Sequence, residues 1–300
     1  MSILHSVPPA PSPSVRAAVT RLARRSSSLI VMGEAPRSLL IDVYGVAPGL
    51  VRVVLHGVPS PSPVPRPQLR RALGVAGREL ISTFGFLDPH KGLEHMIAAM
   101  SEVVARFPRA LYAIVGRTHP ELARHAGEAY RRTLEQDVAS RGLGDNVVFV
   151  NGFVTVGQIV EYLAASDVYV TPYLDMDQVT SGTLAYALGQ GRAVVSTPYT
   201  HAREALSHGR GVIVPPADSA ALADAVVTLL RDPPQRRAME LRAAAYGAAM
   251  TWPTVGAQTL AILRSAIGPA PRAFELAARD ADRGSSRFGR RLGTGIAATG

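Results

Sequence analysis

The chain has 300 residues, of which 47% are hydrophobic and 18% charged, and its formal net charge is +9. This length predicts one large domain or two small ones. The absence of cysteine excludes disulfides, thiolate metal sites and cysteine nucleophiles. No run of about 18 apolar residues and no signal peptide stands out, so we expect a cytoplasmic protein.

The positive charge is carried almost entirely by arginine. Lys91 is the only lysine among 32 basic residues. The arginines are scattered and aromatic residues make up only 6% of the chain. This pattern lacks the stacking platform of a nucleic-acid-binding surface, so we expect no nucleic acid partner. An anionic small ligand, or plain genomic arginine bias, explains the charge better.

The first 58 residues predict a small front domain. Helices are expected at 14–25 and about 35–45, and strands at 28–32 and 51–57. The proline-rich stretches 8–13 and 59–67 predict breaks in regular structure, and we interpret 59–67 as an extended linker.

The longer back part, residues 68–232, alternates strands with helices. Residues Leu93, Met96, Ile97, Met100, Val103, Val104 and Phe107 form one apolar helix face. Strands are expected at 79–85, 110–116, 146–153, 167–172, 193–197 and 211–215. Helices are expected near 120–140, 155–165, 182–190, 201–207 and 218–231. Apolar strands in such alternation predict an α/β fold with a doubly wound parallel sheet.

Two further helices, at about 233–248 and 252–266, define a terminal segment 233–267. Residues 268–300 are rich in Pro, Gly, Arg and Ser and predict a disordered basic tail. A solvated tail and a basic contact arm are the two interpretations.

Ligands of open parallel sheets bind outside the carboxyl ends of the strands. The loops expected there carry a dense set of polar side chains: Lys91, Arg117, His119, Tyr173, Asp175, Asp177, Gln178, Ser181, His201, Arg203 and Glu204.

Two of these loops predict an anion site. The segment TSGT (180–183) opens a helix, whose free N–H groups favour an anion, and Gly182 permits close backbone approach. Lys91 is a compact cation at the start of another helix on the same edge. Together they predict a diphosphate site, although an ordinary helix cap and a surface lysine explain each one singly.

The remaining sequence patterns are weaker evidence for a functional site. Asp175 and Asp177 form a D-x-D pattern, which suits a divalent cation, sugar hydroxyls or a solvated loop. We expect no metal there. His119 and His201 are lone histidines, and a structural role explains each better than a catalytic one. The chain has no G-x-S-x-G elbow, no Walker motif and no dinucleotide-binding glycines in its first strand–helix turn.

The ordered series of back-domain segments resembles a known family. It includes FGFLDPHKGLEHMIAAM, GLGDNVVFVNGFV, TLAYALGQGRAVVST and GRGVIVPPADSAALADAVVTLLRD, and it spans about residues 75–267. It resembles the donor-binding half of retaining GT-B glycosyltransferases (group 1, family 4-like). The resemblance implies two Rossmann-like domains, of which 1–58 would be an incomplete acceptor-side domain. It also implies that Trp252 packs in a terminal crossover helix.

The resemblance implies roles for individual residues. Lys91 would contact the donor diphosphate, and Ser181, Gly182 and Thr183 would offer helix-start amides to it. The catalytic set would be Lys91, Asp177 and Glu204. The donor-binding set would be Gly85, Lys91, Gly152, Phe153, Tyr173, Gln178, Ser181, Gly182, Thr183 and His201. No metal and no cofactor other than the nucleotide-sugar donor is implied.

The chain also departs from the family pattern. Phe86 replaces an arginine that pairs with the lysine, and the family's Glu-x7-Glu pattern falls on Asp177 and Ala185. The front domain is short for a GT-B enzyme, and neither His5 nor His56 is assigned a role.

The resulting hypothesis is a metal-independent glycosyltransferase that moves a sugar from a nucleotide-diphosphate donor to an unknown acceptor with retention. The alternative is a truncated, non-catalytic nucleotide-sugar-binding subunit. A partner chain that completes the front domain, and peripheral contact with a membrane, are both left open.

Overall fold

A computed structural model describes residues 1–152 and 154–267. Its contacts divide the chain after Thr259, inside the last described helix. The disordered tail predicted at 268–300 lies outside the described residues. Within the described part, no helix is long and apolar enough to cross a membrane.

The front domain contains a three-stranded parallel sheet in the order β1-β2-β3. Its strands are β1 (Ser2–Ile3), β2 (Leu29–Val31) and β3 (Val51–Val53), and its helices are α1 (Pro13–Arg24), α2 (Glu34–Asp42) and the 3-10 turn η1 (Pro48–Leu50). Strand β1 was not predicted, and the strand expected at 51–57 ends at Val53. Leu29, Val31 and Leu40 form the centre of its core.

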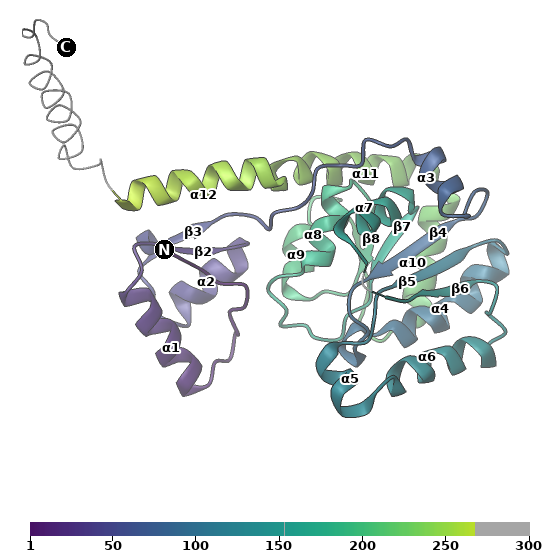
Figure 1. Cartoon of the computed structure of the whole chain (residues 1–300), viewed down its shortest axis with the longest axis horizontal. Coiled ribbons are helices and arrows are strands. Elements are labelled where there is room, and N and C mark those ends of the chain that lie inside the picture. Colours follow the sequence, from purple (N-terminus) through teal and green to yellow (C-terminus); the bar gives the residue numbers. More distant parts are fainter. Residues whose placement is uncertain (153, 268–300) are drawn as a thin grey trace, which may run out of the picture. The chain divides into compact units, whose positions relative to one another are not determined.

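The back domain contains a six-stranded parallel sheet in the order β6-β5-β4-β7-β8-β9 (Figure 1). The strands are β4 (Leu80–Phe84), β5 (Leu111–Val115), β6 (Val147–Val150), β7 (Val168–Thr171), β8 (Ala193–Ser196) and β9 (Val212–Ile213). The order reverses between β4 and β7, which is where doubly wound sheets bind ligands. The predicted α/β fold is confirmed.

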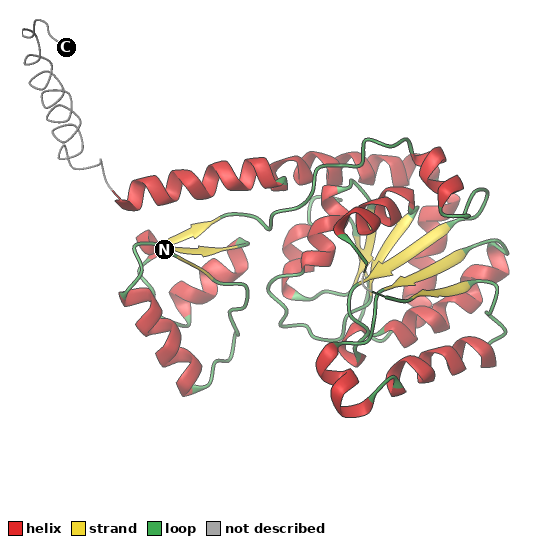
Figure 2. Cartoon of the chain, viewed as in Figure 1, coloured by secondary structure: helices red, strands yellow, loops and turns green. Residues whose placement is uncertain are grey.

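Helices cover both faces of this sheet, as Figure 2 shows. After the front domain, the helices and 3-10 turns of the chain are, in order, α3 (Arg66–Ala72), η2 (Pro89–Lys91), α4 (Leu93–Arg106), α5 (Pro120–Ala126), α6 (Ala129–Ser140), α7 (Val156–Ala165), α8 (Gly182–Gly189), α9 (Thr200–Ala205), α10 (Ser219–Arg231), α11 (Pro233–Gly247), η3 (Ala248–Met250) and α12 (Trp252–Ile267). Alternate strand residues face opposite layers, because side chains of a strand point to opposite faces.

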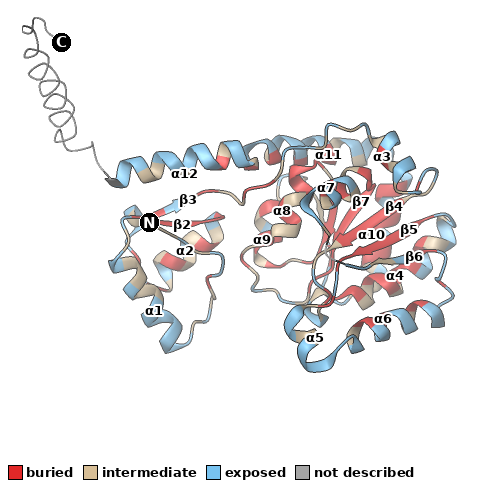
Figure 3. Ribbon diagram, viewed as in Figure 1, coloured by how far each residue is buried: buried red, intermediate tan, exposed pale blue. Residues whose placement is uncertain are grey.

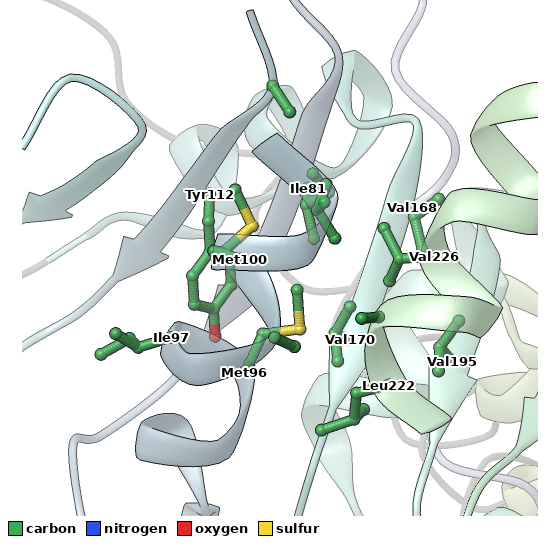
Figure 4. Packing of buried hydrophobic residues seen from close by; sticks show 14 of the residues in the cluster. Ile81, Met96, Ile97, Met100, Tyr112, Val168, Val170, Val195, Leu222 and Val226 are labelled. Atoms are coloured by element: carbon green, nitrogen blue, oxygen red, sulfur yellow. The ribbon is translucent and has the colours of Figure 1, made fainter. Parts of the chain in front are cut away.

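One layer is built from α4, α6 and α10 against the sheet. Figure 4 shows its packing, in which Met96 and Met100 of α4 meet Tyr112, and Leu222 and Val226 of α10 face the central strands. The other layer includes α8, α9 and α11 over Tyr169 and Val194. Buried residues therefore fill the strands β4, β5, β7 and β8, whereas the outer helix faces are exposed (Figure 3).

One helix prediction was wrong, and two predicted boundaries shift by one or two residues. The helix expected at 120–140 is two helices, because the chain turns at Gly127, where φ is +58°. Helix α3 begins inside the segment interpreted as a linker, with a proline in its first turn, which is a position that proline tolerates. Pro13 likewise begins α1.

Candidate active site

A cavity of about 580 Å³ opens where β4, β5 and β6 end. Its lining combines apolar rings, glycines and polar side chains: Phe84, Gly85, Phe86, Asp88, His90, Lys91, Val115, Gly116, Arg117, His119, Gly152, Val154, Ile159, Asp175, Gln178 and Thr183. The predicted site residues Gly85, Lys91, Gly152, Gln178 and Thr183 are therefore brought together.

Glycines allow the loops to meet at the floor of this cavity. Gly116 has φ +142°, and a Cβ there would collide with the carbonyl oxygen of Gly85 at the end of the neighbouring strand. A side chain at Gly116 would therefore push the ends of β4 and β5 apart.

Local hydrogen bonds hold Lys91 at the edge of the cavity. The Asp88 carboxylate accepts from the His90 amide and begins the turn η2. The turn ends at Gly92 with φ +60°, where a Cβ would collide with the Pro172 carbonyl. The Leu174 amide donates to the His90 carbonyl at 2.8 Å, which ties this loop to the loop after β7.

The Lys91 ammonium lies 3.8 Å from the centre of the Tyr173 ring, a cation–π contact. Tyr173 is only 1% exposed and stacks on Tyr199 with ring centres 5.1 Å apart. Its hydroxyl is 2.7 Å from the Thr183 hydroxyl. Tyr173 is thus a buried support that joins Lys91 to the start of α8.

The start of α8 is capped by Ser181, whose hydroxyl accepts from the Leu184 amide. The Ser181 amide itself donates to Nδ1 of His201 at 2.9 Å. The N–H groups of Gly182 and Thr183 have no acceptor within the helix, because helix starts leave such groups unpaired. The unpaired N–H groups of the helix start therefore lie in its first turn beyond Ser181.

His201 lies behind the loop and is 4% exposed. Burial, with a smaller contribution from His56, lowers the pKa of His201 to about 4, so its ring is neutral at pH 7. Since Nδ1 accepts from Ser181, the proton resides on Nε2. This arrangement orients the loop that opens α8.

Two of the three predicted catalytic residues do not line the main cavity. Asp177 is exposed and lines a second hollow that includes His5, whereas Asp175 lines both this hollow and the main cavity. The Glu204 carboxylate accepts from the amides of Glu34 at 2.7 Å and Ala35 at 3.0 Å, and so caps helix α2. Phe153 lies outside the described residues.

Both acids of the D-x-D pattern line the hollow that includes His5, and only Asp175 also lines the main cavity. In the described ranges, no group of three or more His, Asp or Glu side chains could hold a metal ion. Ala185, which occupies the second position of the Glu-x7-Glu pattern, is fully buried.

Arg117 and His119 lie beside Phe86, the residue that replaces the family's arginine. The Phe86 side chain is 44% exposed, and the Arg117 guanidinium lies 5.8 Å from its ring centre. The His119 ring meets Phe86 edge-on at 5.3 Å. Arg117 therefore adds a second permanent positive charge to the cavity that holds Lys91.

Sequence reasoning missed the apolar walls formed by Phe84, Val154 and Ile159, and it assigned no role to His56. Phe84 is the last residue of an apolar strand, so nothing in the sequence distinguished it from a core residue. His56 had no signal either, because its position depends on contacts with residues far along the chain.

Residues 78–232 match the family model described as glycosyl transferases group 1. The match covers more than half of the 300 residues. The chain belongs to the group 1 glycosyl transferases. The predicted family is thereby confirmed.

Two curated relatives extend this similarity. The chain is 28% identical over 274 residues to a D-inositol 3-phosphate glycosyltransferase of Kineococcus radiotolerans, covering 86% of this chain and 62% of the relative. It is 27% identical to a GDP-mannose-dependent alpha-(1-6)-phosphatidylinositol monomannoside mannosyltransferase of Mycolicibacterium smegmatis, covering 76% and 59%. The chain thus spans about three fifths of the length of these relatives.

Among solved structures, the chain is similar to HepE of Anabaena, crystallised in complex with UDP. The TM-score is 0.75 at 24% identity, covering 88% of this chain and 71% of HepE. This likeness supports the GT-B fold.

Proposed function

We propose that this chain binds a nucleotide-diphosphate sugar in the 580 Å³ cavity and transfers the sugar to an acceptor. The observation that carries the proposal is the convergence of Lys91 and the start of α8, at Thr183, on one cavity at the carboxyl ends of the strands. A diphosphate leaving group develops negative charge, and prearranged cations and amides at that point stabilise it.

In this proposal, Lys91 and the amides of Gly182 and Thr183 hold the diphosphate. Gly85 and Gly152 would allow the backbone to approach the nucleotide, and Gln178 and Asp175, which line the cavity, would orient the sugar hydroxyls. Asp177 and Glu204 are proposed to act only at the edge of the site, because neither lines the main cavity. The transfer is proposed to proceed with retention and without a metal.

The first experiment is thermal unfolding of the purified chain with UDP, GDP and ADP. UDP and GDP are chosen because similar proteins are named with these nucleotides. A ligand at about 100 times its Kd stabilises the folded state by roughly 2.7 kcal/mol, a shift of several degrees. We expect Lys91→Ala to lose this shift and the control Arg132→Ala, an exposed cation on α6, to keep it.

No shift with any nucleotide in a chain that melts cooperatively would refute donor binding. If one nucleotide binds, its glucose and mannose conjugates are tested next for transfer, with inositol phosphate and phosphatidylinositol as first acceptors, following the relatives' names. Transfer that continues in a metal chelator, with an axial donor linkage preserved in the product, would support metal independence and retention.

A second candidate is a nucleotide-sugar-binding subunit that requires a partner chain. The three-stranded front sheet favours it, because a short parallel sheet presents unpaired strand edges within the described residues. Nucleotide binding without transfer or donor hydrolysis by the chain alone would select this candidate.

A further inference from the structure

His56 lies against the start of α8, beside the proposed donor cavity. A Cβ placed on Gly182 would be 3.2 Å from Nε2 of His56. The two residues line a hollow of about 390 Å³ together with Lys91, Ser181 and Thr183. This hollow is continuous with the donor cavity, since both share Phe84, Lys91, Ile159, Gln178 and Thr183.

The position of His56 is set by the back domain itself. Two residues further on, Val58 is fully buried, its amide donates to the Met250 carbonyl at 2.8 Å, and its carbonyl accepts from the Trp252 amide at 3.0 Å. Val58 also packs against Gly189 on α8, leaving no room for a Cβ there. Since Gly182 and Gly189 belong to the same helix, these contacts fix His56 over the helix start.

One ring nitrogen of His56 already makes a hydrogen bond. Nδ1 lies 2.8 Å from the carbonyl oxygen of Gly57, which can only accept, so Nδ1 carries a proton. In the neutral ring, Nε2 is then the free lone pair, and it faces Gly182. Burial lowers the pKa of His56, the Gly57 carbonyl opposes this, and His5 adds to the lowering. The unliganded ring is therefore neutral at pH 7.

The groups that face His56 supply no negative charge. They are Lys91 after β4, Tyr186 on α8, His201 on α9 and His5 in the front domain. No Asp or Glu occurs among the described residues that line the hollow. An anion that entered the hollow would be the one charge able to hold a proton on Nε2, because a nearby negative charge favours the protonated ring.

We infer that His56 is a donor-site residue whose Nε2 takes a proton from solvent when a nucleoside diphosphate binds, and then donates a hydrogen bond to a phosphate oxygen at the start of α8. This inference rests on the proposed donor function. The protonated His56 ring would supply the diphosphate with a positive charge that the unliganded site lacks. Lys91 and protonated His56 then bracket the phosphates from two loops.

The test is isothermal titration calorimetry of UDP and GDP at pH 7.5 in two buffers of different ionisation enthalpy. For the wild-type chain we expect uptake of a fraction of a proton, up to one, per bound nucleotide. His56→Gln places an amide near the Nε2 position and cannot titrate, so we expect no uptake and binding weaker by about 10-fold or more. The controls His90→Gln and His119→Gln, in the same cavity, should retain the proton uptake.

The outcomes separate the two proposals. Equal affinity and equal proton uptake in wild type and His56→Gln would overturn the role of His56, while a dependence on Lys91 would leave the donor site standing. No nucleotide binding by the wild-type chain would overturn both. If His56→Gln does not fold, an NMR titration of the wild-type His56 ring decides the matter: its pKa should rise when UDP is added, and an unchanged value would overturn the inference.

Discussion

Replacing Asp167 with asparagine should destabilise the back domain far more than the loss of an ordinary ion pair. Asp167 stands just before β7, at the end of the sheet away from the cavity. Its carboxylate contacts Arg66 at 2.7 Å, Arg70 at 3.0 Å and Arg236 at 3.6 Å, and it accepts from the Leu80 amide at 2.8 Å. It therefore joins helices α3 and α11 to the sheet.

The expected magnitude follows from burial. The Asp167 side chain is 11% exposed and that of Arg70 is 15% exposed. Removing one partner of a buried pair costs about 3–5 kcal/mol, because the remaining charge is left without compensation. Since Arg66 is 31% exposed and asparagine keeps one acceptor, we expect the lower end, about 3 kcal/mol.

Urea unfolding of Asp167→Asn and of the control Asp137→Asn would measure this difference. Asp137, which is 27% exposed, pairs at 2.8 Å with Arg141, which is 38% exposed, at the end of α6, so its loss should cost only about 0.5 kcal/mol. In thermal melts, the Asp167 variant should unfold roughly 6–12 °C lower than wild type. Equal costs for the two variants would refute the argument from burial.

The same network predicts a pH dependence. Burial alone would raise the pKa of Asp167, but Arg66, the Leu80 amide, Arg70 and Arg236 outweigh it and hold the pKa below its ordinary value of 3.8. The stabilisation is therefore complete above that ordinary value and is lost as pH falls through the lower folded-state value. The gap between wild type and Asp167→Asn should stay constant from pH 7 to about 5 and close below about 4.

Two further predictions concern the cavity. Gly116→Ala should cost more stability than Gly142→Ala and should also reduce the nucleotide-induced thermal shift. Gly142 has φ +67° and open space around it, so an alanine there bears only a backbone cost of about 1–2 kcal/mol. An alanine at Gly116 would in addition collide with the Gly85 carbonyl at the cavity floor. Equal costs in urea unfolding would contradict this. Tyr173→Leu should weaken UDP or GDP binding by about 3- to 10-fold in calorimetry, because it removes the ring beneath Lys91, whereas Tyr173→Phe keeps the ring and should bind nearly as wild type. Equal weakening by both would show that the cation–π contact does not place Lys91.

The sequence by itself determined the layered architecture of the back domain. Its strands are apolar runs because both faces are covered, and the apolar face of α4 repeats at helical spacing, so local pattern and burial agree. The same logic placed Lys91 and the start of α8 on one edge of the sheet, since the carboxyl ends of parallel strands share an edge. The break at Gly127 escaped prediction, because a glycine inside a polar pattern is compatible with both a helix and a turn.

Only the tertiary structure decided which polar residues face the cavity. Asp175 and Asp177 are two positions apart, yet only Asp175 lines the main cavity, whereas both line the hollow that includes His5. Glu204 caps α2, which lies 170 residues earlier in the chain, and His56 reaches α8 because Val58 is buried against Gly189. Such contacts arise from packing between distant segments, and local sequence pattern carries no information about where those segments meet.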